Sequence, residues 1–365
     1  MTQQRTANVA LNAICPYFTM FPLDFPLGIL RRRASRRDRV LDPFCGRGTT
    51  NFAARLLGLE SWGIDSNPVA GAITSAKLVR TTPAAVVQEA KSMIEDYRRP
   101  EIPNGEFWSR AYHPDVLRSL CSLRAGLLER RSSMTRRALR AIVLGALHGP
   151  LQKTFPSYFS NQCPRTYAPK PAYAIRYWRK HRMMPPNLDV LAIIQRRADR
   201  YYNGNLPEGS GDVILGDSRD PAAFAASGPF QWVITSPPYY GLRTYLQDQW
   251  LRNWFLGGPD TVDYSTPGQL SHSSAESFAD QLRQVWENAA GVCRDGATLV
   301  IRFGGISDRN ADPREVLAQS LHRTAWRLTR VNNAGHARHG RRQADAFLPV
   351  LSRPSTEHDF WACLG

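Results

Sequence analysis

The stretch VLDPFCGRGTTNFAARLL, residues 40–57, decides the fold that we expect for this chain. A short apolar run ends at Leu41, and Gly46 and Gly48 allow the backbone to turn tightly and approach a ligand. Helix-forming residues follow, and one of the two threonines after Gly48 is expected to cap that helix. The stretch therefore predicts a strand, a glycine loop and a helix, the first unit of a ligand-binding α/β sheet.

A second unit of the same kind follows. The apolar run 62–64 ends at Asp65, and Asn67 and Pro68 are typical of a helix N-cap followed by a proline at the first helical position. A carboxylate at the end of the second strand can accept hydrogen bonds from both hydroxyls of a ribose. Asn51 occupies the third glycine position of a dinucleotide-binding loop, so the pattern favours a nucleoside ligand over a dinucleotide.

Far downstream, the apolar run 232–234 leads into the loop Thr-Ser-Pro-Pro-Tyr-Tyr-Gly, residues 235–241. Its prolines fix the backbone and carry no N–H, and Tyr239 offers a flat face to a base. Together, the two loops resemble the cofactor and catalytic loops of S-adenosylmethionine-dependent amino-methyltransferases, which methylate an exocyclic NH2 of a nucleobase. The Ser-Pro-Pro-Tyr form is most similar to the N4-cytosine DNA branch.

This resemblance implies direct in-line methyl transfer to a flipped base, with positioning and electrostatics supplying most of the rate. It assigns the acceptors for the two amino N–H groups to the Ser236 side chain and the Pro237 carbonyl. Because stacking needs only the ring, we expect Tyr239→Phe to be mild. The implied catalytic residues are Ser236, Pro237, Pro238 and Tyr239. The implied S-adenosylmethionine-binding residues are Tyr17, Thr19, Asp42, Phe44, Cys45, Gly46, Gly48, Thr49, Thr50, Asp65, Ser66, Asp217 and Ser218, with Asp65 at the ribose and the last two at the adenine.

The expected fold class is α/β, a doubly wound, Rossmann-like methyltransferase sheet with a mainly helical insertion. Residues 1–79 would form the N-terminal part of the core with the cofactor loop, 80–211 a helical insertion for target recognition, and 212–365 the C-terminal part with the catalytic loop. The insertion would separate the ribose-binding and adenine-binding loops, which departs from the common arrangements of the family. The periodicity predicts helices at 114–130, 136–147, 187–202 (capped by Asn187) and 276–290, and strands at 297–303, 325–331 and 358–364.

The charge balance favours a nucleic-acid partner. The chain has 47 Lys and Arg against 31 Asp and Glu, a net charge of +16, which attracts phosphates. The window 151–188 contains no acidic residue and alternates cations with aromatic rings, which suits phosphates and unstacked bases. A second acid-free basic stretch, 323–343, is the alternative surface, and the arginine run 31–37 is a minor candidate. The residues expected to bind DNA are Lys153, Tyr158, Arg165, Lys170, Arg176, Arg179, Lys180 and Arg243.

The six cysteines show no metal-type spacing, so we expect no metal site. Cytosine-C5 methylation would need a nucleophile in a Pro-Cys loop at the catalytic position. Cys163-Pro164 is the nearest rival motif, although it does not follow the strand-end pattern that such a nucleophile needs. No apolar run is long enough to cross a membrane, and the N-terminus lacks a basic segment followed by an apolar one. The reducing cytoplasm is the expected location.

We therefore expect a site-specific DNA methyltransferase that transfers a methyl group from S-adenosylmethionine to N4 of cytosine. Its partner would be DNA, expected to be double-stranded, with a restriction endonuclease as a candidate second partner. The alternatives are N6-adenine DNA methylation, RNA guanine-N2 methylation, and a catalytically inactive DNA-binding protein. Retention of the Ser-Pro-Pro-Tyr loop beside a glycine loop favours an enzyme.

Overall fold

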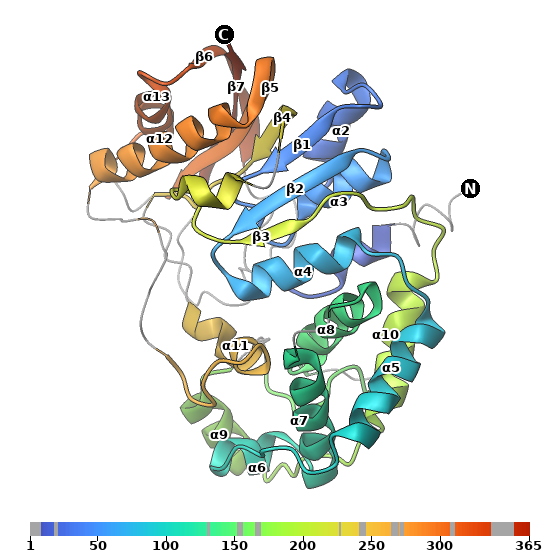
Figure 1. Cartoon of the computed structure of the whole chain (residues 1–365). Coiled ribbons are helices and arrows are strands. Elements are labelled where there is room, and N and C mark those ends of the chain that lie inside the picture. The colour runs from blue at the N-terminus through green and yellow to red at the C-terminus, as the bar shows by residue number, and fades with distance from the viewer. Residues whose placement is uncertain are drawn as a thin grey trace. The chain divides into compact units, whose positions relative to one another are not determined.

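A computed structural model describes residues 9–17, 21–129, 132–151, 156–164, 169–225, 228–240, 246–263, 270, 274–306, 311–336 and 354–365 (Figure 1). The chain forms two compact units. The unit that we call the sheet unit comprises 17–78, 207–244 and 266–365. The helical unit comprises 1–16, 79–206 and 245–265.

The sheet unit contains a seven-stranded sheet in the order β3-β2-β1-β4-β5-β7-β6 (Figure 1). Its strands are β1 (Arg39–Asp42), β2 (Glu60–Asp65), β3 (Val213–Leu215), β4 (Phe230–Thr235), β5 (Cys293–Ile306), β6 (Trp326–His336) and β7 (Pro354–Leu364). Strands β3, β2, β1, β4 and β5 are parallel, and β7 pairs antiparallel with both β5 and β6. The order reverses between β1 and β4, and in open α/β sheets the ligand binds at such a switch point, beyond the carboxyl ends of the strands.

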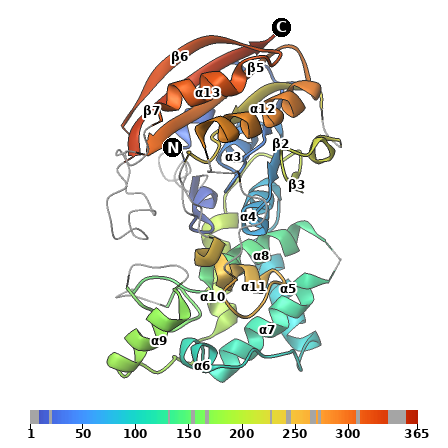
Figure 2. The same cartoon turned by 90° about the vertical axis from the view of Figure 1, so that its left-hand side faces the viewer.

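Helices cover both faces of this sheet. One face packs against α12 (Ala275–Gly291) and α13 (Pro313–Leu321), which lie across it in Figure 2. The other packs against α2 (Asp24–Arg33) and α3 (Thr49–Leu56), and α4 (Pro68–Leu78) contacts α3, β2 and β3. Neighbouring strand residues alternate between the two cores: Leu41 and Val233 face α12, whereas Val40 and Trp232 face α2. The predicted doubly wound α/β fold is therefore confirmed.

The helix that follows the cofactor loop is capped differently from our prediction. Neither Thr49 nor Thr50 caps α3: the N-cap is Gly48, in a left-handed conformation and without a side-chain hydrogen bond. The two threonines lie inside the first turn and are buried. In contrast, the prediction for α4 is confirmed, because the amide of Val69 donates to Oδ1 of Asn67 at 2.9 Å.

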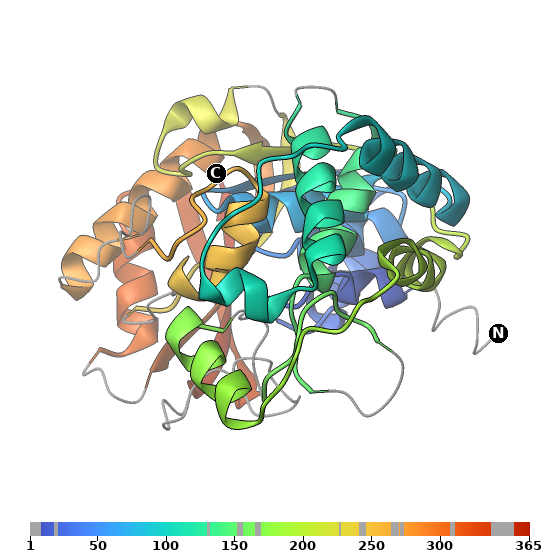
Figure 3. The ribbon, with the colours of Figure 1, turned by 90° about the horizontal axis from the view of Figure 1, so that it is seen from below.

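The helical unit consists of α5 (Pro83–Asp96), α6 (Glu106–Ala111), α7 (Pro114–Leu128), α8 (Met134–Ala146), α9 (Pro171–Lys180), α10 (Val190–Tyr202) and α11 (Trp250–Phe255) (Figure 3, teal to yellow-brown). It also contains short 3-10 turns at Leu11–Ala13 and Leu246–Gln249. The three helices predicted in this part of the chain form as α7, α8 and α10. The cap of α10 is Asp189 instead of Asn187, since the Asp189 side chain accepts a hydrogen bond from the amide of Ala192. No helix in the described ranges is long and apolar enough to span a membrane.

Two segments that we assigned to the methyltransferase core belong to the helical unit, 1–16 and 245–265. The side chains of Leu11 and Ile14 are fully buried, and α11 inserts aromatic and aliphatic side chains into the same unit. The Arg252 guanidinium donates to the carbonyl of Pro16 at 2.7 Å, which ties the two segments together. The boundary with the sheet unit therefore falls at 207, five residues before the predicted 212.

Candidate cofactor and catalytic site

The structure brings the two predicted loops together at the switch point of the sheet. Thr235 ends β4, and its hydroxyl donates a hydrogen bond of 2.6 Å to Oδ1 of Asp42, which ends β1. The Thr50 hydroxyl, on α3, donates to the carbonyl of Ile234 at 3.1 Å. The side chains of Thr50, Thr235 and Asp42 are all buried. The cofactor loop and the catalytic loop thus start from one buried hydrogen-bonded cluster.

Asp42 is a buried carboxylate with an unused acceptor. Its Oδ1 also accepts from the amide of Phe44 at 3.1 Å, whereas Oδ2 is buried without a hydrogen-bond partner in the described part of the chain. Burial raises the pKa of Asp42 to about 7, although the nearby hydroxyls of Thr235 and Thr50 and the amide of Phe44 lower it. A buried carboxyl with a free oxygen gains when a cation binds beside it. The end of β1 therefore fits a ligand with a positively charged group.

Asp65 holds the glycine loop against the end of β2. Its Oδ2 accepts from the amide of Gly46 at 2.8 Å and its Oδ1 from the amide of Asn67 at 2.9 Å. Desolvation by burial raises the pKa of Asp65 to about 6. Since a carboxylate oxygen has two lone pairs, both oxygens keep an acceptor site for hydroxyl groups.

The conformation of the loop requires glycine at Gly48. Its φ is +71°, and an added Cβ would lie 2.5 Å from Cγ2 of Thr74. The Thr74 hydroxyl in turn donates to the carbonyl of Gly46 at 2.9 Å. Cys45, between Phe44 and Gly46, is buried, and burial raises the pKa of its thiol well above its ordinary value. Cys45 therefore shapes the loop as a neutral side chain.

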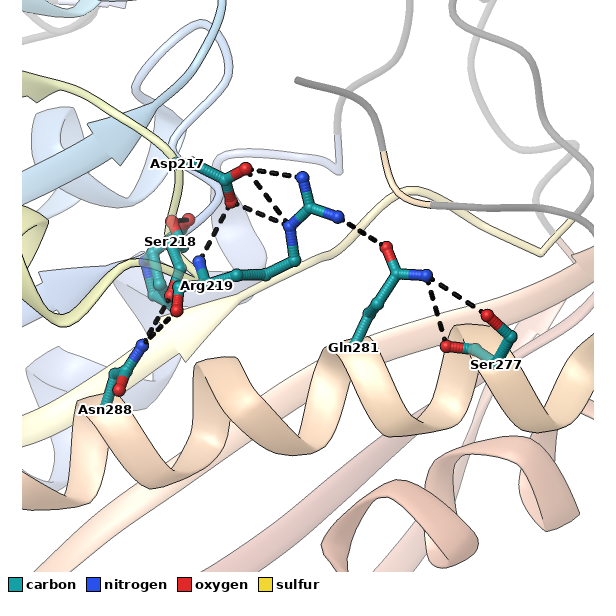
Figure 4. A network of polar contacts seen from close by, with 7 residues as sticks. Asp217, Ser218, Arg219, Ser277, Gln281 and Asn288 are labelled. Carbon is teal, nitrogen blue, oxygen red and sulfur yellow. Dashed lines mark hydrogen bonds and ion pairs between the residues drawn. The ribbon is translucent and has the colours of Figure 1, made fainter. Parts of the chain in front are cut away.

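The loop after β3 lies against the cofactor loop (Figure 4). The Ser218 hydroxyl donates to the carbonyl of Pro43 at 2.5 Å, and Nδ2 of Asn288, on α12, donates to the carbonyls of Ser218 and Arg219 at 3.1 and 3.0 Å. The Arg219 guanidinium binds the Asp217 carboxylate, with Nε at 3.0 and 3.1 Å from its two oxygens, and this lowers the pKa of Asp217. Because Arg219 occupies that carboxylate, the backbone of this loop is the better candidate for an adenine contact.

Arg219 is itself held by α12, as Figure 4 shows. Its Nη1 donates to Oε1 of Gln281 at 2.7 Å, and Gln281 donates to Ser277 one turn earlier. Arg219, Gln281 and Asn288 were not predicted from the sequence. Polar residues on an amphipathic helix carry no signal of their own, because only the tertiary fold shows which of them faces a loop.

The catalytic loop continues from β4. Ser236, Pro238 and Tyr239 are half-buried, and Pro237 is buried. The Ser236 hydroxyl makes no hydrogen bond to another described residue. The Tyr239 ring packs edge-on against Phe303, with centroids 5.5 Å apart at 80°, and its hydroxyl donates to Oε1 of Glu357 at 2.7 Å. Glu357 lies 118 residues away on β7 and was not predicted from the sequence.

The remaining predicted cofactor residues are placed as follows. Phe44 packs edge-on against Trp286 of α12, with ring centroids 6.2 Å apart. Tyr17 is half-buried in the sheet unit, and Ser66 is exposed after β2. Thr19 lies outside the described residues. These observations leave the contacts of Tyr17, Thr19 and Ser66 with a cofactor as predictions.

In the helical unit, α9 carries most of the described candidates for nucleic-acid binding. Its buried face consists of Ala174 and Trp178, whereas Tyr173, Arg176 and Lys180 are exposed. The Tyr173 and Tyr177 rings are stacked, with centroids 6.4 Å apart at 23°, and His181 continues the stack 4.4 Å from Tyr177. Arg176 and Lys180 form no ion pair with any other described residue. This face of α9 therefore presents two exposed cations beside exposed rings.

Other members of the predicted DNA-binding set are placed less favourably. Arg179 forms an ion pair with Glu106, with Nε 2.7 Å from Oε1, and Lys170 is exposed at the start of α9. Tyr158 is only 7% exposed, because its ring packs on Gly149 and under the Arg197 guanidinium. Our assignment of Tyr158 to the nucleic-acid surface is therefore wrong. Three members lie outside the described residues, namely Lys153, Arg165 and Arg243.

The alternative basic stretch is described only in part. Arg327 and Arg330 are exposed on β6, the edge strand of the sheet, and the Arg330 guanidinium lies 4.6 Å from the centre of the Trp361 ring. The rest of this stretch, from 337 onward, lies outside the described residues. Arg33, in the minor candidate run, also lies over Trp361, at 5.0 Å.

The rival nucleophile Cys163 is unsuited to attack. Its side chain is fully buried, with Sγ 3.5 Å from Nε2 of His148, and the other ring nitrogen of His148 is 2.6 Å from the Ser160 hydroxyl. Burial raises the pKa of Cys163 to about 12 and lowers that of His148 to about 3, so both are neutral at pH 7. A neutral buried thiol is a poor nucleophile. The described ranges contain no group of three or more His, Cys, Asp or Glu side chains that could hold a metal ion.

These features define the class of domain. A doubly wound sheet with a glycine loop after β1, an acidic residue at the end of β2 and a buried carboxylate at the switch point is typical of Rossmann-like domains that bind nucleoside ligands. Residues 2–74, about one fifth of the chain, match the N6_N4_Mtase family model, described as DNA methylase. No curated protein sequence matches the chain.

Several solved structures are distantly similar. The rRNA methyltransferase AviRa from Streptomyces viridochromogenes is 14% identical with a TM-score of 0.37, covering 100% of this chain and 92% of that chain. The SAM-dependent methyltransferase from Methanosarcina mazei is 8% identical with a TM-score of 0.36, covering 94% and 97%. Magnesium protoporphyrin IX methyltransferase from Synechocystis, with bound SAM, is 9% identical with a TM-score of 0.35, covering 94% and 78%. The substrates in these names are properties of those proteins.

Proposed function

We propose that this chain is an S-adenosylmethionine-dependent DNA methyltransferase that methylates the exocyclic N4 of cytosine. The observation that carries the proposal is the hydrogen bond between Thr235 and Asp42, which places the Ser-Pro-Pro-Tyr loop and the glycine loop at one switch point. A methyl donor and a base acceptor must meet within about 3.5 Å for in-line transfer. The match of residues 2–74 to the DNA methylase family model supports DNA as the substrate.

The proposed cofactor fits the residues at the ends of β1 and β2. S-adenosylmethionine, when bound, supplies a methyl group activated on a sulfonium. Asp42 has the buried, unpartnered oxygen that suits the ammonium of the methionine part, and Asp65 keeps acceptor sites for the ribose hydroxyls. Backbone groups of the loop at Asp217 and Ser218 would contact the adenine. Gly46 and Gly48 leave the cofactor loop without side chains at these two positions, where the backbone adopts a positive φ.

In the proposed reaction, the residues of the catalytic loop hold the target base. The Ser236 hydroxyl and the Pro237 carbonyl accept hydrogen bonds from the amino group of cytosine, which localises the nitrogen lone pair and directs it at the methyl group. Tyr239 stacks on the extruded base. No covalent intermediate with the enzyme is needed, in agreement with the buried, neutral thiols of Cys45 and Cys163.

The helical unit would supply DNA contacts. Arg176 and Lys180 on α9 are exposed cations without an ion-pair partner among the described residues, so they can neutralise phosphates. Tyr173 adds a ring that is 43% exposed. We propose that double-stranded DNA is the substrate and that the helical unit recognises the target sequence. A restriction endonuclease that cuts the same sequence is the proposed biological partner.

The test is to incubate the purified chain with deuterated S-adenosylmethionine and genomic DNA, and to analyse the digested DNA by mass spectrometry. N4-methylcytosine carrying the label is expected, and modified-base sequencing of the same DNA gives the recognised site. Ser236→Ala is the matched negative control. If only labelled N6-methyladenine is found, the target base is adenine and not cytosine. If the label is found only as N2-methylguanine in RNA, the substrate is RNA and not DNA. DNA binding without any transferred label would identify an inactive DNA-binding protein.

A further inference from the structure

The acidic side chain of Glu357 contacts Tyr239 of the catalytic loop. Glu357 is only 8% exposed, although it lies near the start of β7. Its neighbours across the sheet are both glycines, Gly304 of β5 and Gly335 of β6. Because Gly304 has no side chain, it leaves room beside Glu357 that a larger residue would fill.

That room is used by the Tyr239 ring. A Cβ added to Gly304 would lie 3.1 Å from Cγ of Glu357 and 3.3 Å from Cε2 of Tyr239, so ring and carboxylate stem both pack over the bare backbone. The Tyr239 hydroxyl donates to Oε1 of Glu357 at 2.7 Å, and Phe303 meets the ring edge-on. The Tyr239 ring is thus held by its connection to Pro238, by packing over the backbone of Gly304, and by the hydrogen bond of its hydroxyl to Glu357.

We propose that Glu357 is a positioning residue for methyl transfer, an inference that rests on the proposed function. By anchoring the Tyr239 hydroxyl, it fixes the plane of the ring on which the target base stacks. The plane of the base sets the direction of the amino nitrogen, and in-line transfer is sensitive to displacements of about 1 Å. Glu357 itself need not touch the base or the cofactor.

The structure therefore changes our expectation for Tyr239→Phe. From the sequence, this variant should be mild, because stacking requires only the ring. With Glu357 as partner, Tyr239→Phe removes the anchor and leaves a buried carboxyl without this donor. We expect the variant to stack the base and yet to lose rate.

The experiment compares Glu357→Ala, Glu357→Gln, Tyr239→Phe and the double variant Glu357→Ala with Tyr239→Phe, on a duplex containing the sequence that the enzyme methylates. Glu357→Ala and Tyr239→Phe should each lower kcat by up to about 100-fold, with an unchanged KM for S-adenosylmethionine. Glu357→Gln should retain most of the activity, because its amide oxygen still accepts the hydrogen bond. The double variant should be no slower than the slower single variant, because both remove the same bond.

Asp359→Asn is the matched control. It removes a carboxylate two residues along the same strand, where Asp359 pairs with Arg302 at 2.8 and 2.9 Å, so it reports on general damage to β7. Its kcat should stay at the wild-type value even where its melting temperature falls. With 2-aminopurine as the target base, fluorescence quenching by Tyr239 should weaken in Glu357→Ala.

Two results would overturn the inference: a wild-type kcat in Glu357→Ala, or a double variant whose loss is the product of the two single losses. Thermal unfolding of the same four variants measures the coupling of Tyr239 and Glu357 independently of methyl transfer. If that coupling is present and wild-type protein methylates no nucleic acid, the proposed function has failed and the Tyr239–Glu357 contact stands. If the wild type is active and Glu357→Ala has the same kcat, only the positioning role of Glu357 has failed.

Discussion

The hydroxyl of Thr235 donates a hydrogen bond to the carboxylate of Asp42 across 193 residues of sequence, at 2.6 Å. The two residues end β4 and β1, the neighbouring strands at which the sheet changes direction. A displacement of either strand end would break this buried bond and move one loop relative to the other. The relative placement of donor and acceptor sites in the proposed reaction therefore depends on a contact that neither loop could make alone.

Replacing Asp42 should weaken cofactor binding. Asp42→Asn preserves the shape of the side chain and removes its charge, so the ammonium of S-adenosylmethionine loses a buried counter-ion, a loss of about 1.5–3 kcal/mol for a hydrogen bond to a charged group. Titration calorimetry should show an affinity about 10- to 100-fold lower. Asp24→Asn, at an exposed carboxylate on α2, is the control and should bind like the wild type. Equal affinity in Asp42→Asn would remove Asp42 from the cofactor site.

Cofactor binding should also depend on pH. Burial raises the pKa of Asp42 to about 7 from an ordinary 3.8, so the carboxyl of the free protein gains its charge only as pH rises through 7. Because the charged form binds the cofactor's ammonium, affinity should increase from pH 6 to pH 8. Asp42→Asn should flatten this dependence. A wild-type affinity that is constant over this range would contradict the assignment.

The raised pKa of Asp42 also predicts how the stability of the folded protein changes with pH. The folded protein binds a proton at Asp42 between about pH 4 and 7, where the unfolded chain does not, so this group lowers the free energy of unfolding as pH rises. Asp42→Asn lacks that contribution. Relative to wild type, its melting temperature should therefore rise from pH 4 to pH 8, measured without cofactor. A difference that shrinks over this range would show that Asp42 is charged in the folded state at low pH.

Gly48 should tolerate no side chain. Gly48→Ala adds a Cβ at φ +71° and 2.5 Å from Cγ2 of Thr74, whereas Gly58→Ala adds one at φ +70° with no atom within 4 Å. Left-handed backbone alone costs about 1–2 kcal/mol for alanine, which Gly58→Ala measures. Urea denaturation should show a larger loss for Gly48→Ala, and only this variant should lose cofactor affinity. Equal losses would mean that Thr74 moves aside freely.

DNA affinity should depend on the exposed cations of α9, Arg176 and Lys180. Replacing Arg176 and Lys180 by Ala should weaken DNA binding and reduce the slope of log affinity against log salt by about two units, one for each lost phosphate contact. Arg179→Ala should have less effect, because Glu106 already pairs with Arg179. Arg98 and Arg99, replaced together, remove the same charge from another exposed part of the helical unit and serve as control. A wild-type slope in the α9 variant would transfer the DNA-binding role to the exposed arginines of β6, Arg327 and Arg330.

The sequence by itself determined the class of fold and the local chemistry. Strand, glycine loop and helix follow from residues 40–57, because short-range patterns of apolar residues, glycine and proline set backbone conformation. The acidic residue at the end of β2 and the Ser-Pro-Pro-Tyr loop can likewise be recognised from residues that are neighbours in the sequence. For the same reason, Asn67 could be recognised as a helix cap from the sequence.

Only the tertiary structure decided which distant groups meet. Glu357 reaches Tyr239, Asn288 reaches Ser218, and segments 1–16 and 245–265 join the helical unit, all over separations for which a single sequence carries no signal. Burial also depends on the tertiary structure. It places Tyr158, a candidate DNA contact, in the core, and it raises the pKa of the Cys163 thiol. The physical reason is that side-chain burial and long-range hydrogen bonds depend on how the whole chain packs, whereas loop and helix propensities depend on neighbouring residues.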